Sequence, residues 1–255
     1  MSDAEGKWAV PRKGADLLES RGMRLIDLTR EIYEGMPIFP AHQRPFMMTN
    51  QTHQGFRERF GTRVGFEAHN WLLSEHTSTH TDAIFEYDAE GPTLDQTPLE
   101  YFYGEAICVD VSDIRHPEYI TRPALERAVE KSGQEIRRGD IFLLHSGHGD
   151  RTYPGKEYIE VYTGLAREAA VWLAEQGVVN IGIDSVAIDH SDDLDFSGHM
   201  VCAEYQIVNT ENLTNLHRLV GRRFLFFGLP LNFRAGTGSP IRAVAWLENR
   251  PLPAE

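Results

Sequence analysis

Short apolar runs that alternate with helical patterns are the feature that most constrains the fold of this chain. Three largely apolar runs have the length of buried strands, and they occupy residues 106–111, 141–144 and 178–183. A helical pattern follows the first run, with Thr121 as a suitable N-cap. A second helical pattern precedes the third run and ends at Gly177. Strands interleaved with a few helices predict an α/β protein.

Further strands are expected at both ends of the chain, at residues 25–28, 223–229 and 242–247. The 255 residues contain neither an internal repeat nor a convincing linker, so we expect one compact domain over residues 24–255. Residues 1–23 are charged and weakly patterned, which predicts a flexible or docked N-terminal arm. The predicted fold is a mixed β-sheet core with few flanking helices.

Residues 46–74 mix aromatic and polar side chains without a clean helical period. The aromatic residues of this segment are expected either to pack in the core or to line a pocket. They are Phe56, Phe60, Phe66 and Trp71.

The charge balance excludes two classes of partner. The chain has 38 acidic residues against 25 Lys and Arg, a net charge of −13, and no basic stripe that could bind phosphates. We therefore expect neither nucleic acid nor an anionic membrane as a partner. The N-terminus lacks a continuous apolar stretch, and the two cysteines make no disulfide framework. These features favour a cytoplasmic protein.

The densest chemical signal is HTSTHTD at residues 76–82. His76, His80 and Asp82 offer two imidazoles and a carboxylate within seven residues, a donor set suited to a divalent metal. On an extended segment all three side chains project from one side, and the Thr and Ser residues between them are poor helix formers. We therefore favour an extended or loop geometry. The alternative is a polar turn whose histidines bond locally.

A second cluster of His, Asp and Glu lies in residues 184–217. His199 and Glu211 stand out because apolar residues flank both, and a buried titratable group needs a partner or a metal to offset its desolvation. The sequence leaves open whether His199 and Glu211 have such a partner or metal, or are solvated residues of an acid-rich loop. The acidic residues of the intervening loop are expected to be solvated; they are Asp192, Asp193 and Asp195.

Several ordered motifs resemble the cyclase family of metal-dependent hydrolases, which includes bacterial kynurenine formamidase and isatin hydrolase. HTSTHTDA is similar to the family signature H-x-[GS]-T-H-x-D-A. The opening IDLT with MPIFP, the second motif GIDS with ENLTNL, and the closing GTGSPIRA also resemble the family's motifs. The resemblance therefore covers most of the chain.

The resemblance implies a site and an assembly. In the formamidase branch, the positions of His76, His80 and Asp82 bind one zinc, and Asp82 bridges to a second zinc held by the positions of His199 and Glu211. In the isatin hydrolase branch, one manganese occupies the first site. The implied cofactor is thus one or two divalent ions, zinc or manganese. The implied fold is a β-rich α/β domain with a barrel-like core, and the implied assembly is a homodimer or homotetramer.

One departure from the family pattern concerns the acid/base group. The family has His four residues after the ligand Asp, and this chain has Glu86 there. Glu86 is predicted to take a proton during catalysis, because Glu serves this role in other zinc hydrolases. It would otherwise be an extra ligand, or mark a changed substrate.

The leading hypothesis is hydrolysis of an amide, cyclic amide or lactone that carries an aromatic or planar ring. Trp71 is expected either in the apolar wall that receives this ring or in the core. The alternatives are a metal-assisted lyase or cyclase, and a binding protein that has lost turnover. His145 and His148 follow a strand and are expected in a pocket or a turn, and the remaining histidines, including His42, in structural or solvated positions.

Overall fold

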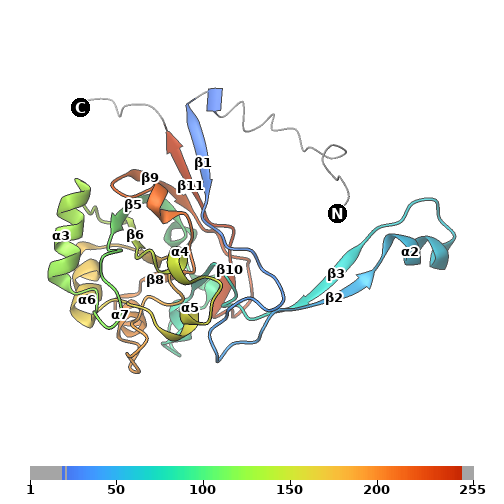
Figure 1. The fold of residues 1–255 in the computed structure, drawn as a ribbon, viewed down its shortest axis with the longest axis horizontal. Coiled ribbons are helices and arrows are strands. Elements are labelled where there is room, and N and C mark those ends of the chain that lie inside the picture. Colours follow the sequence, from blue (N-terminus) through green and yellow to red (C-terminus); the bar gives the residue numbers. More distant parts are fainter. Residues whose placement is uncertain (1–18, 21, 249–255) are drawn as a thin grey trace.

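The computed structural model describes residues 19–20 and 22–248 (Figure 1). Residues 1–18 and 21 of the predicted N-terminal arm lie outside the described residues, and strand β1 begins at Met23. The strands are β1 (Met23–Asp27), β2 (Phe46–Gln51), β3 (Ala68–Leu72), β4 (His80–Asp82), β5 (Tyr103–Asp110), β6 (Ile141–His145), β7 (Asn180–Ile183), β8 (Val208–Glu211), β9 (Arg223–Phe227), β10 (Gly238–Pro240) and β11 (Val244–Glu248).

The helices are short and few. The α-helices are α2 (His53–Phe60), α3 (Arg122–Ser132), α4 (His148–Thr152), α5 (Glu157–Glu160), α6 (Arg167–Gln176) and α7 (Ser197–Tyr205). The 3₁₀ turns are η1 (Ile84–Glu86), η2 (Leu94–Gln96), η3 (Leu99–Tyr101) and η4 (Leu216–Arg218). No helix within the described ranges is long and apolar enough to cross a membrane.

Nine strands form one curled, mixed sheet in the order β1-β11-β9-β5-β6-β7-β8-β4-β10. The four central strands β5, β6, β7 and β8 are parallel and follow one another in sequence. Successive crossovers of one hand place their helices on the same face of a sheet. Helices α3, α6 and α7 accordingly lie together on one side (Figure 1).

The alternation of side chains along β5 divides the interior into two cores. Ile107 and Val109 pack toward the helices, in a cluster that includes Leu125 of α3. Ala106 and Cys108 face the concave side of the sheet, where they meet side chains from β1, β9 and β11. This double burial explains why the central strands are apolar on both faces. The predicted α/β class, with a mixed sheet and few helices, is confirmed.

Strands β2 and β3 pair only with each other and project from the body with helix α2 at their tip, an element that we call the arm (Figure 1). No residue between 46 and 72 is buried. The prediction that the aromatic residues of this segment pack in the core or line a pocket is therefore wrong. Trp71 is 45% exposed and Phe66 is 49% exposed, because a two-stranded ribbon leaves both faces open.

Candidate metal centre

The site lies at the β8-β4-β10 end of the curled sheet. His80 and Asp82 belong to β4 and point to the same side of it, as the alternation of an extended strand requires. Strand β8 pairs antiparallel with β4 so that Glu211 stands opposite His80. His199 reaches the same point from α7. The predicted extended or loop geometry is confirmed, with His80 and Asp82 on an extended strand and His76 in the turn before it.

His76 lies in the turn that precedes β4. Ser78 adopts a left-handed conformation there, with φ of 61°, and its hydroxyl donates to the carbonyl of Arg30 at 2.9 Å. His76 Nε2 lies 2.9 Å from the hydroxyl of Thr237, which turns His76 Nδ1 toward the site. A Cβ on Gly238 would lie 2.7 Å from Cε1 of His76. The glycine-rich closing motif therefore lets this imidazole pack directly against β10.

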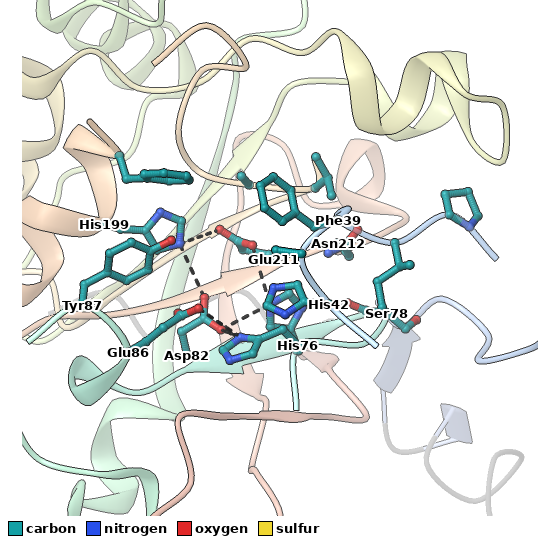
Figure 2. Close-up of a pocket in the computed structure, with 17 residues that line it drawn as sticks. Phe39, His42, His76, Ser78, Asp82, Glu86, Tyr87, His199, Glu211 and Asn212 are labelled. Atoms are coloured by element: carbon teal, nitrogen blue, oxygen red, sulfur yellow. Dashed lines mark hydrogen bonds and ion pairs between the residues drawn. The ribbon is translucent and has the colours of Figure 1, made fainter. Parts of the chain in front are cut away.

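The five predicted ligand residues meet around Asp82 (Figure 2). Oδ1 of Asp82 lies 2.6 Å from His76 Nδ1 and 3.2 Å from His80 Nε2. Its other oxygen, Oδ2, lies 3.7 Å from His199 Nε2. Glu211 spans both groups, with Oε2 at 3.6 Å from His80 Nε2 and Oε1 at 3.2 Å from His199 Nε2. All five side chains are buried.

In His80 and His199, the ring nitrogen that faces away from the centre, Nδ1, is hydrogen-bonded to a neighbouring group. Nδ1 of His80 lies 2.8 Å from the carbonyl of Ser78, and Nδ1 of His199 bonds to the carboxylate of Asp189. These bonds turn both Nε2 atoms toward the centre. Metal-binding histidines show the same arrangement, in which the outer nitrogen bonds a carbonyl or a carboxylate.

The charges of the cluster also fit a cation. Three carboxylates, those of Asp82, Glu86 and Glu211, share the pocket, and none of its lining residues is Lys or Arg. Burial lowers the pKa of His80, but the charge of Asp82 outweighs it and raises that pKa to about 9. Burial also opposes the charged form of His199, and the carboxylates of Asp189 and Glu211 raise its pKa well above the ordinary range. Without a cation, protons neutralise the cluster, and a divalent ion would replace them.

Glu86 lies on η1 at the side of this cluster. Its Oε1 is 3.5 Å from His76 Nδ1, and its Oε2 is buried without a hydrogen-bond partner. Burial, followed by the charge of Asp82, raises the pKa of Glu86 to about 8. The side chain is thus a carboxyl group next to the predicted ligands, with one buried oxygen that lacks a hydrogen-bond partner.

A cavity of about 230 Å³ opens above the centre. About half of its lining residues are apolar or aromatic, namely Pro37, Ile38, Phe39, Ala41, Tyr87, Val186, Ala187 and Phe196. Trp71 is not among the lining residues. His42, which was expected in a structural or solvated position, does line the cavity and stacks on His76 with ring centroids 4.8 Å apart. His145 and His148 lie outside it, and His148 bonds the carbonyl of Tyr158 at 2.9 Å.

Sequence reasoning missed two residues of the centre. Asp189 belongs to an acid-rich stretch, but it is only 2% exposed and bonds His199. Asn209 carries no motif; only its spacing of two residues from Glu211 on β8 places it on the same face of the sheet. Its amide nitrogen lies 3.2 Å from Glu211 Oε1.

Comparisons with known proteins identify the family of the chain. Residues 26–190 match the model of the Cyclase family, described as "Putative cyclase". The chain is 29% identical over 231 residues to a kynurenine formamidase of Salinibacter ruber, which covers 91% of this chain and all of the relative. A kynurenine formamidase of Bacillus mycoides is 31% identical over 172 residues, or 68% of this chain and 76% of the relative.

The fold is similar to that of isatin hydrolase A from Labrenzia aggregata, solved with benzyl benzoate, with a TM-score of 0.80. The two chains are 22% identical, and the match covers 93% of this chain and 98% of that one. Fold and comparisons together confirm the predicted class, a metal-dependent hydrolase acting on carbon–nitrogen bonds other than peptide bonds. More particularly, the chain belongs to the cyclase family.

Proposed function

We propose that this protein hydrolyses the amide bond of a small substrate that carries an aromatic or planar ring. The observation that carries the proposal is that three imidazoles and the carboxylate of Glu211 gather around Asp82 in the lining of one cavity. An apolar pocket with a few converging polar groups is the usual form of a small-molecule site.

The cofactor in this proposal is a divalent cation held by His76, His80 and Asp82, with Glu211 and His199 beside them. Imidazole and carboxylate donors suit zinc best, and manganese is the second candidate. When bound, the cation supplies a Lewis acid that polarises the scissile carbonyl and lowers the pKa of a water molecule. The carbonyl of Ser78 and the carboxylate of Asp189 orient the imidazoles of His80 and His199 toward the proposed cation site.

The substrate class follows from the cavity and from the relatives. A cavity of about 230 Å³ lies below the roughly 300–1,000 Å³ of pockets for drug-sized ligands, which favours one ring or one fused ring system. The rings of Phe39, Tyr87 and Phe196 offer faces against which a planar group can pack. The names of the relatives point to N-formyl and cyclic amides of aromatic compounds, and lactones share the same carbonyl chemistry.

Glu86 is the proposed acid/base group of the reaction. Glu86 lines the cavity, and its buried Oε2 has no hydrogen-bond partner. The carboxylate would take a proton from the attacking water and return it to the leaving nitrogen. His42 and Tyr87 also line the cavity at this point.

Elemental analysis of protein purified without added metal, combined with a panel of N-formyl aromatic amines, isatins and lactones, tests the proposal. We expect a bound divalent ion and release of an acid from at least one member of the panel. Release of unsaturated product without uptake of water would instead show a metal-assisted lyase. Bound metal without any turnover would show a binding protein.

We also propose that a second copy of the chain covers the arm, in a homodimer or homotetramer. Phe46, Met48 and Leu72 are each more than half exposed on β2 and β3, and an isolated two-stranded ribbon is marginally stable in water. Light scattering after size-exclusion chromatography should give more than one chain per particle. Substitution of Met48 and Leu72 by Glu should shift the particle toward a monomer, and an unchanged mass would contradict the proposal.

The proposed location is the cytoplasm. Both cysteines of the chain, Cys108 and Cys202, are free and buried, which is the usual state of thiols in reducing compartments. Fractionation of the source cells with a specific antibody would test this location, and recovery from an oxidising compartment would contradict it.

A further inference from the structure

The two oxygens of Asp82 divide the centre into two halves (Figure 2). Oδ1 faces the half that contains His76 and His80. Oδ2 faces the half that contains His199 Nε2 and Glu211 Oε1. A second cation would need the three groups of this latter half.

A protein side chain already contacts all three groups of the His199 half. The amide nitrogen of Asn209 donates to Asp82 Oδ2 at 2.5 Å and to Glu211 Oε1 at 3.2 Å, and it lies 3.2 Å from His199 Nε2. No other contact partner in the described chain is common to these three groups. A primary amide has two N–H donors, so Asn209 supplies the two carboxylates with partial positive charge on one side of the centre.

The backbone of Asn209 leaves its amide little freedom to withdraw. The residue is 3% exposed and lies on β8 between the partner strands β7 and β4. Its carbonyl accepts from the hydroxyl of Thr81 at 2.9 Å. The orientation of the amide also follows from its neighbours, because the carbonyl oxygen in place of the nitrogen would face two carboxylate oxygens.

We infer that Asn209 restricts the centre to one divalent cation per chain, by keeping Asp82 Oδ2, His199 and Glu211 engaged with its amide. The inference rests on the proposed metal centre and adds its stoichiometry. The first half, with His76, His80 and Asp82 Oδ1, holds the ion, and His199 with Asp189 becomes part of its supporting shell. The two-ion arrangement implied by the formamidase branch then does not apply to this chain.

Manganese alone is the probe for this inference, since its electron paramagnetic resonance distinguishes isolated from coupled ions. The full-length protein is loaded with excess Mn²⁺, freed of unbound ion by gel filtration, and measured for metal content and resonance. We expect one ion per chain and the spectrum of isolated Mn²⁺. Two ions per chain with a coupled spectrum would overturn the inference and leave the metal centre intact. No bound ion would overturn the metal centre itself.

A variant without the Asn209 amide tests whether that amide is what excludes a second cation. Asn209→Ala should raise the Mn²⁺ content from one ion to two per chain, because it frees Asp82, His199 and Glu211. Asn180→Ala is the matched control: Asn180 is also buried, donates to the carbonyl of Tyr101 and accepts from Thr210, but it has no hydrogen bond to the three groups, so this variant should keep one ion. A content of one or none in Asn209→Ala would overturn the inference, the latter because Asn209 would then be a ligand. If Asn209→Ala does not fold, the wild-type spectrum still decides.

Discussion

Replacement of Glu86 by Gln separates proton transfer from metal binding. Glu86→Gln keeps the size and polarity of the side chain but cannot accept a proton. If Glu86 is the acid/base group, we expect kcat to fall about 10²–10⁴-fold, equivalent to about 2.7–5.4 kcal/mol of transition-state stabilisation. The metal content should stay unchanged, because the ligand atoms around Asp82 are untouched.

The same substitution should stabilise the metal-free protein at neutral pH. The pKa of Glu86 is about 8 in the folded protein and about 4.5 in the unfolded chain, so the folded state keeps a proton that the unfolded state releases. Wild-type stability is therefore fully present below pH 4.5 and is lost as pH rises through 8. Gln has no proton to lose. At about 1.4 kcal/mol per pH unit, the variant should gain about 3 kcal/mol at pH 7 and nothing at pH 4.

Steady-state kinetics, elemental analysis and thermal melts of chelated protein measure these three effects. Glu90→Gln is the matched control, because Glu90 is exposed in the turn that follows η1, and it should change none of them. Loss of metal in Glu86→Gln would make Glu86 a ligand. Full activity with full metal content would refute the proton-transfer role, and the shuttle would have to be another residue of the cavity, with His42 the first candidate.

Three further predictions concern the ligands and the cavity. His80→Ala should lose most of its bound metal and its activity, measured by elemental analysis and turnover; retention of both would contradict the ligand assignment. Asp189→Asn should weaken metal binding by up to about 10-fold by calorimetry, because it removes the carboxylate that positions His199 beside the ion, and unchanged affinity would contradict that support. Since the pKa of His80 is about 9 without metal, a cation displaces a proton there below pH 9, so metal affinity should fall as pH falls from 8 to 6; constant affinity would refute this competition.

Sequence patterns predicted those strands and helices that a local pattern of apolar and capping residues specifies. The run at 141–144 became β6 over Ile141–His145, and the helical pattern after Thr121 became α3, with Thr121 at its N-cap. HTSTHTD predicted the geometry of His80 and Asp82, because donors two residues apart share one side of an extended strand, but not the turn that holds His76. Secondary structure and the side of a strand on which a side chain lies depend on residues close in sequence, so a single sequence can predict them.

The remaining features depend on contacts between distant segments. The pairing of Glu211 with His80 is a register of β8 against β4, and no local period specifies it. Aromatic residues such as Trp71 suggested a core or a pocket wall, but burial depends on a partner surface, which the arm lacks in the described part of the chain. Asn209 carried no motif, because its importance comes from the three groups that the fold brings against it.

Turnover in ¹⁸O-labelled water tests the central claim most directly. Chelated protein, and the same protein reloaded with zinc or manganese, are each incubated with the best substrate of the panel, and the acid product is weighed by mass spectrometry. We predict no product from the chelated sample and, from the reloaded sample, an acid that has gained one ¹⁸O atom from the solvent. Equal turnover without metal, or a product that lacks the label, would contradict a metal-dependent hydrolase.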